Sequence, residues 1–62
     1  MVIAVIDGQG GGIGKALVER IKGDKELRGY LLIALGTNSI ATGQMLRAGA
    51  DEGATGENAI IH

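Results

Sequence analysis

The residues best suited to chemistry form a glycine-rich segment near the N-terminus, Gly8–Gly14, which holds five of the chain's twelve glycines. An apolar run precedes this segment, and a stretch with helical periodicity follows it. Where a strand leads through a glycine turn into a helix, phosphate groups commonly bind the N–H groups that open the helix. We therefore predict a phosphate-binding loop whose ligands are the backbone N–H groups of Gln9–Gly14. The candidate residues of this loop are Gly8, Gln9, Gly10, Gly11, Gly12, Ile13 and Gly14.

Polar residues near the predicted turns are further candidates. Thr37 and Asn38 follow a second apolar run, where we expect helix caps first and contact with a ribose or phosphate second. Asp7 follows the first run and begins the glycine-rich turn, and a turn or capping role is favoured for it over a metal ligand or phosphate acceptor. Asp7 and Asp51 could both lie at carboxyl ends of strands, where open α/β sheets bind ligands such as magnesium. Two carboxylates alone do not define a metal site, and we assign none.

The first part of the chain has the pattern of a strand followed by a helix. Val2–Ile6 is short, apolar and β-branched, which is typical of a strand buried on both faces. From Ile13 the period changes, and the residues predicted to form the apolar face of a helix are Ile13, Ala16, Leu17 and Ile21. Gly23 suits the end of this helix.

The next part repeats the pattern. Tyr30–Leu35 is a second apolar run, expected to pair in parallel with the first because a helix joins the two. Gly36–Ser39 supplies a turn and an N-cap from Thr37, Asn38 or Ser39. A second helix follows and ends at Gly49, with its apolar face formed by Ile40, Ala41, Met45 and Ala48.

The remainder of the chain is ambiguous. Ala50–Ala54 could be a third strand, followed by a helix that starts at Thr55–Glu57; Thr55, Glu57 and Asn58 then cap a helix first and contact a ligand second. Alternatively, Ala59–His62 begins a strand. Both readings give an α/β fold, a Rossmann-like parallel β-α-β-α-(β) unit in a single domain of residues 1–62. We expect this unit to be the N-terminal part of a larger three-layer domain, because the chain stops within an apolar run.

Composition excludes several classes of site. The net charge is −1 with mixed signs, so no basic surface for nucleic acid is expected. There is no cysteine, and the single histidine is the last residue, which argues against thiolate or histidine metal centres. The apolar runs are too short to span a membrane, and no export signal precedes them. We predict a cytoplasmic protein.

The spacing of the glycines distinguishes between nucleotide motifs. Neither G-x-G-x-x-G nor G-x-x-x-x-G-K-[ST] is matched. Gly8-x-x-x-Gly12-Ile13-Gly14 instead resembles the T-G-x-x-x-G-I-G turn of the short-chain dehydrogenase/reductase family. That resemblance implies NAD or NADP as cofactor, with Gly8 at the tight turn, Gly12 against the phosphates and Gly14 where the helix closes on the strand.

Three departures from that family set limits on the resemblance. Asp7 replaces the family's threonine and brings a carboxylate close to the expected pyrophosphate. The second run ends in Leu35-Gly36-Thr37-Asn38, without an acidic residue to hold a ribose or an adjacent arginine for a 2′-phosphate. The family's catalytic Tyr-x-x-x-Lys is absent, because Ala34 lies four residues after Tyr30.

A second resemblance spans nearly the whole chain. The segments IDGQGGGIGKALVE, IALGTN and AGADEGATGENAI are similar to an uncharacterised family of small bacterial proteins, domain of unknown function 3842. The resemblance implies a Rossmann-like fold and members that continue past His62, and it implies no activity. With two fully apolar strands, the chain is expected to self-associate or to pair with a missing C-terminal part.

The sequence therefore supports three hypotheses of function. The first is a nucleotide- or dinucleotide-binding module whose ligand carries phosphate. The second is a non-catalytic structural or regulatory protein whose glycine turn is architectural. The third, metal-assisted phosphate chemistry at Asp7, ranks lower. No catalytic residue can be named.

Overall fold

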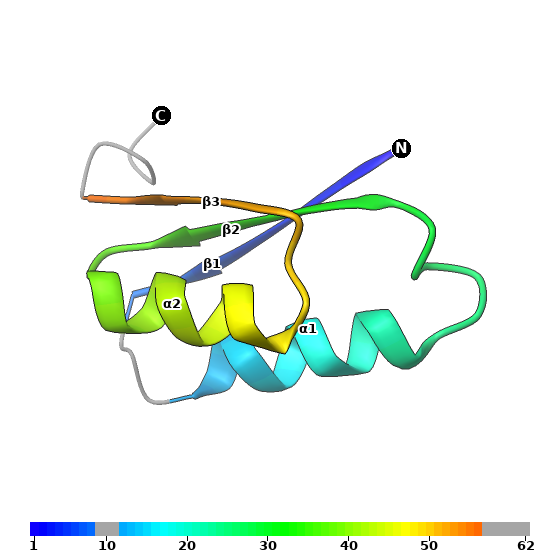
Figure 1. Cartoon of the computed structure of the whole chain (residues 1–62), viewed down its shortest axis with the longest axis horizontal. Helices are drawn as coiled ribbons and strands as arrows, with labels where there is room; N and C mark the ends of the chain where they lie inside the picture. Colours follow the sequence, from blue (N-terminus) through cyan, green and yellow to red (C-terminus); the bar gives the residue numbers. More distant parts are fainter. Residues whose placement is uncertain (9–11, 57–62) are drawn as a thin grey trace.

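The computed structural model describes residues 1–8 and 12–56. Its elements are β1 (Val2–Asp7), α1 (Ile13–Gly23), β2 (Leu31–Gly36), α2 (Ser39–Ala48) and β3 (Glu52–Thr55). The strands form one parallel sheet in the order β1-β2-β3. Both helices lie side by side against the same face of the sheet (Figure 1). The predicted Rossmann-like α/β unit is confirmed.

The structure settles the ambiguous third element in favour of a strand. β3 covers Glu52–Thr55 and pairs with β2, so Thr55 ends a strand and does not start a helix. The alternative strand at Ala59–His62 lies outside the described residues. Gly53 allows β3 to run close to α2, because a Cβ there would lie 2.9 Å from the Thr42 methyl carbon.

The core lies between the sheet and the two helices. Alternate strand residues point toward the helices, and these include Val5, Leu32 and Ala34. Val18 from α1 and Met45 from α2 are completely buried against them. An aliphatic core without aromatic residues suits this arrangement, because small and branched side chains let the helices approach a parallel sheet closely.

The apolar face predicted for α1 is wrong except at Ile21, which is half-buried against the core. Ile13 and Leu17 are 64% and 46% exposed, and Ala16 is also exposed. The buried residues are Gly14 and Val18. The helix is turned this way because Gly14 faces β1 so closely that a Cβ on it would lie 2.8 Å from the Asp7 Cβ and 2.7 Å from the Met45 sulfur.

The apolar face predicted for α2 is right in part. Ala41 and Met45 are buried and Ala48 is half-buried, but Ile40 is 64% exposed. Thr42 is buried in its stead, 6% exposed. Hydrogen bonds to the neighbouring strand explain how a polar residue takes that place, as described below.

The sheet is covered on one face only within the described residues. We call the other face the open face; strand alternation and register assign to it Val2, Ala4, Ile6, Leu31, Ile33, Leu35, Glu52 and Ala54. Val2 is 57% exposed, Ile6 53% and Leu31 38%. The prediction that the first strand is buried on both faces is therefore wrong for this chain. No helix among the described residues is long and apolar enough to cross a membrane.

Candidate functional site

The two turns that lead into the helices leave from one edge of the sheet. Asp7 is paired in register with Gly36, and Gly36 with Thr55, so the carboxyl ends of all three strands form one row. Open parallel sheets bind their ligands at this edge. The structure thus brings Gly8, in the described part of the glycine segment, next to Thr37 at the start of the second turn.

Gly12 shapes the first turn. Its φ is 89° and its ψ is 0°, a left-handed conformation that L residues rarely adopt. It is the N-cap of α1, and no side chain caps the helix from that position. Helix geometry leaves the N–H groups of Ile13 and Lys15 without partners in their own helix. The first turn of α1 therefore opens with donors that its own cap does not use.

Asp7 has a structural role in this turn. Its carboxylate Oδ2 accepts a hydrogen bond of 2.9 Å from the Gly14 N–H, and the residue is 5% exposed. An anion at the N-terminus of a helix also interacts favourably with the helix dipole. The hydrogen bond from the Gly14 N–H thus supports the interpretation of Asp7 as a capping residue.

Asp7 and Asp51 do not share a site. Asp51 precedes β3, at the amino end of that strand, so the expectation that both lie at carboxyl ends is wrong. Within residues 1–8 and 12–56, no group of three or more His, Cys, Asp or Glu could hold a metal ion. The register of β3 could not be derived from the sequence, and it separates the two carboxylates.

Asp51 links three elements at the opposite end of the sheet. Its Oδ2 accepts 2.8 Å from the Leu32 N–H and lies 3.4 Å from the Lys22 Nζ. The Leu32 N–H, and to a smaller extent Lys22, hold the pKa of the Asp51 carboxyl below its ordinary value, although desolvation opposes this shift. Asp51 thus joins the start of β3 to β2 and to the end of α1, and it is not part of the candidate site.

The second turn is closed by its own side chains. Asn38 is the N-cap of α2, and its Oδ1 accepts 2.8 Å from the Ala41 N–H. The Thr37 hydroxyl donates 2.9 Å to the Gly8 carbonyl, and the Thr37 N–H donates 3.2 Å to the Asp7 carbonyl. Asn38 therefore has the expected role of a cap, whereas Thr37 does not cap the helix and instead joins the second turn to the first.

A hydrogen-bonded threonine pair beside this edge, in which Thr42 is buried and Thr55 is exposed, was missed from the sequence. The Thr42 hydroxyl lies 3.2 Å from the Asn38 carbonyl and 3.3 Å from the Ala54 carbonyl, and it accepts 2.7 Å from the Thr55 hydroxyl. Gly36 makes room for it, because a Cβ at Gly36 would lie against the Thr42 hydroxyl oxygen. The only sequence signal was a hydroxyl residue inside the predicted apolar stretch of α2.

Of the predicted loop residues, Gly8, Gly12, Ile13 and Gly14 are described, and they lie at the carboxyl edge as expected. The remaining three, Gln9, Gly10 and Gly11, lie outside the described residues.

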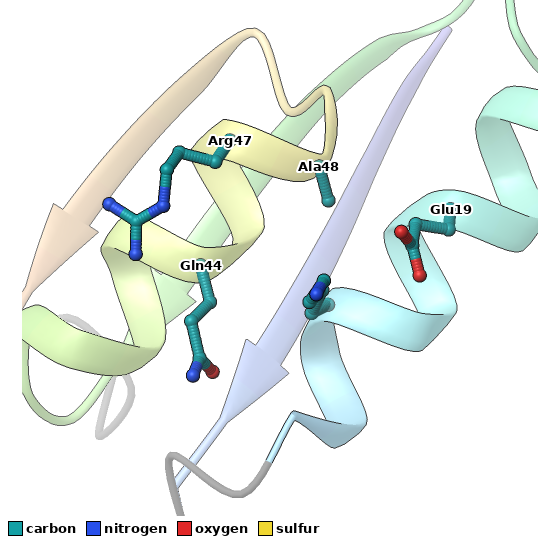
Figure 2. A pocket seen from close by; sticks show the side chains of 5 residues that line it. Glu19, Gln44, Arg47 and Ala48 are labelled. Atoms are coloured by element: carbon teal, nitrogen blue, oxygen red, sulfur yellow. The ribbon is translucent and has the colours of Figure 1, made fainter.

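A separate cleft of about 390 Å³ lies between α1 and α2, lined by Lys15, Glu19, Gln44, Arg47 and Ala48. Figure 2 shows Glu19 reaching toward α2, while the Arg47 guanidinium lies over α2 on the side away from α1. The Gln44 Oε1 is buried without a hydrogen-bond partner in the described part of the chain. Because the cleft runs along the helices and carries both signs of charge, we do not regard it as the phosphate site.

Comparisons with known proteins identify the family. Searches of curated proteins and of solved structures each returned no match. One family model, described as a domain of unknown function, DUF3842, matches residues 2–62. That match includes both turns, the three strands and the two helices described above, and the chain belongs to this family of uncharacterised domains.

Proposed function

We propose that the first turn binds a phosphate-bearing small molecule, of the nucleotide or dinucleotide class, through the N–H groups that open α1. The observation that carries this proposal is the Gly12 cap, which turns the chain into the helix without a capping side chain of its own, so that of the first-turn donors the Gly14 N–H is the one bound by the Asp7 carboxylate. These donors lie at the end of β1, and the helix dipole adds partial positive charge there. NAD and NADP are the cofactors to test first.

The Asp7 carboxylate opposes an anion in the same place. It lies within hydrogen-bond distance of the Gly14 N–H, one of the first-turn donors. A ligand would therefore use the N–H groups of Ile13 and Lys15, with the Lys15 ammonium able to offset part of the repulsion. The same contact also supports the alternative hypothesis that the turn is only architectural, because Asp7 already places negative charge at the N-terminus of the helix.

Nuclear magnetic resonance can separate the two functions. We expect inorganic phosphate, NAD, NADP, FMN or ATP at millimolar concentration to shift the amide signals of Gly12, Ile13 and Lys15. The amides of Gly49 and Gly53 lie outside the candidate turn and serve as internal references. If no ligand moves the first-turn amides of the folded protein, the architectural function is correct.

Ile13→Glu provides a variant with a matched control. Ile13 is 64% exposed in the first turn of α1, and a carboxylate there favours the helix dipole but repels phosphate. We expect the dissociation constant to rise about tenfold, which corresponds to roughly 1.4 kcal/mol. Ile40→Glu makes the same change at equal exposure in the first turn of α2 and should leave binding unchanged.

Asp7→Asn tests the opposing charge. The amide keeps an oxygen for the Gly14 N–H while removing the negative charge, so phosphate ligands should bind several-fold more tightly. If Asp7 holds a cation instead, the same variant should remove any magnesium dependence of binding. Equal affinity with and without the substitution would leave Asp7 a structural residue.

A further inference from the structure

The cleft between α1 and α2 lies on the outer side of the helix layer. Its lining residues Lys15 and Glu19 are exposed, whereas Val18 and Met45 of the same helices are buried in the core. In a three-layer α/β domain the helix layers enclose the sheet, so the outer side of a helix layer faces solvent whatever completes the sheet. The volume of about 390 Å³ is within the range of roughly 300–1,000 Å³ typical of small-molecule sites. The cleft is therefore large enough and open enough for a small ligand.

Three polar groups of the cleft have no partner among residues 1–8 and 12–56. The Gln44 Oε1 is buried and accepts no hydrogen bond there. Lys15 and Glu19 are one helical turn apart, a spacing at which opposite charges can pair, but within the described residues neither forms an ion pair. Glu19 instead reaches toward α2 (Figure 2). The cleft thus offers one cation and two acceptors, the Glu19 carboxylate and the Gln44 oxygen.

Arg47 lines the cleft but is turned away from its middle. The guanidinium lies back along its own helix, with a nitrogen 3.4 Å from the position that a Cβ on Gly43 would take. Figure 2 shows it on the side of α2 away from α1. The other polar side chains of the lining, Lys15, Glu19 and Gln44, together carry no net charge. This balance favours a ligand that is neutral overall and has one charge of each sign.

We propose that the cleft binds a neutral α-amino acid. The ammonium group of the ligand donates hydrogen bonds to the Glu19 carboxylate and the Gln44 Oε1, and its carboxylate interacts with the Lys15 ammonium. Gln44 is only half-buried, so its carboxamide has room to turn toward the ligand. The two charged groups of an α-amino acid are joined through one carbon, which is short enough to lie between side chains one helical turn apart. The proposal does not depend on phosphate binding at the first turn, because it rests on the side chains of the cleft.

Nuclear magnetic resonance with matched probes tests the site. L-Alanine at up to about 10 mM should shift the side-chain amide signals of Gln44 and the backbone amides of Glu19 and Ala48, with a dissociation constant on the order of 1 mM. Propionate lacks the ammonium and ethylamine lacks the carboxylate, so each should bind about tenfold more weakly. The Gly12 amide should not move, which separates this site from the first turn. The absence of a shift with L-alanine, or equal binding of propionate or ethylamine, would overturn the proposal.

Two variants assign the contacts. Glu19→Gln should raise the dissociation constant about tenfold, whereas Glu26→Gln makes the same change at an exposed position outside the cleft and should leave it unchanged. Gln44→Leu should abolish binding without lowering the midpoint of thermal unfolding, because a buried acceptor without a donor does not stabilise the fold. Unchanged binding in Glu19→Gln would exclude the cleft, and a lower unfolding midpoint in Gln44→Leu would show that Gln44 has a structural role. Either result would overturn the proposal.

Discussion

The turn before α1 and the turn before α2 occupy equivalent places, each at the carboxyl end of a strand. They differ in the group that accepts hydrogen bonds from the N–H groups at the start of the helix. The second is closed by a side chain of its own, because the Asn38 oxygen takes the Ala41 N–H. The first depends on the left-handed backbone of Gly12, and its Gly14 N–H donates to the carboxylate of Asp7 on the preceding strand. A turn whose own side chain accepts from the helix N–H groups leaves fewer of these donors for a ligand. The comparison supports our proposal that a phosphate group binds at the first turn and not at the second.

The largest effect is expected where the first turn closes on the sheet. In Gly14→Ala the new methyl group would lie 2.7 Å from the Met45 sulfur and 2.8 Å from the Asp7 Cβ. Overpacking of this kind costs about 1–3 kcal/mol, a large part of the roughly 3–5 kcal/mol that a core of this size supplies. Chemical unfolding followed by circular dichroism should show most of the stability lost.

Gly43→Ala is the control for that variant. Gly43 lies within α2, and the nearest atom to a new Cβ is a guanidinium nitrogen of Arg47 at 3.4 Å. Alanine is the better helix former by about 1 kcal/mol, so this variant should be more stable than the unchanged chain. A Gly14→Ala variant as stable as Gly43→Ala would disprove the close approach of α1 to β1.

A smaller effect distinguishes the caps. Asn38→Ala removes the acceptor for the Ala41 N–H and should lower the free energy of unfolding by about 1 kcal/mol. Asn38→Asp keeps an oxygen in place and should cost much less. Neither change should alter phosphate binding if only the first turn binds the ligand. Reduced binding in a folded Asn38→Ala variant would show that both turns contribute to one site.

The smallest effect concerns Asp51, which accepts a backbone N–H as Asp7 does but is partly exposed. Because its pKa is lower in the folded chain, the carboxylate stabilises the fold above the pKa of the unfolded chain. This contribution disappears as the pH falls through the folded pKa. Unfolding measured between about pH 6 and pH 2 should therefore depend less on pH in Asp51→Asn. An unchanged pH profile would show that the contact adds nothing measurable.

Much of the fold followed from local patterns, because apolar runs, glycines and caps act over a few residues. The ends of α1 at Gly23 and of α2 before Gly49 were predicted correctly, as was the capping role of Asn38. The side of α1 that faces the sheet was not. Ile13 and Leu17 suggested an apolar stripe, whereas the close contact at Gly14 decides the orientation, and that contact requires knowledge of Asp7 and Met45 in space.

The candidate site was predictable to a similar extent. The glycine spacing located the turn, and the parallel order of the strands placed Thr37 beside it. The carboxylate contact to Gly14 and the pairing of Thr42 with Thr55 depend on register between strands, which leaves no mark in a single sequence. The same is true of Asp51, whose position at the amino end of β3 rules out a magnesium site shared with Asp7.

The two hydrogen bonds from Thr37 have a consequence for how the molecule opens. They join the start of the second turn to Asp7 and Gly8, across 29 residues in the case of the hydroxyl bond. Detaching the beginning of α2 from the sheet must therefore also release the end of β1. The two strand-helix units are expected to exchange their amide protons as one cooperative unit, and a ligand held at the first turn would slow exchange at the second.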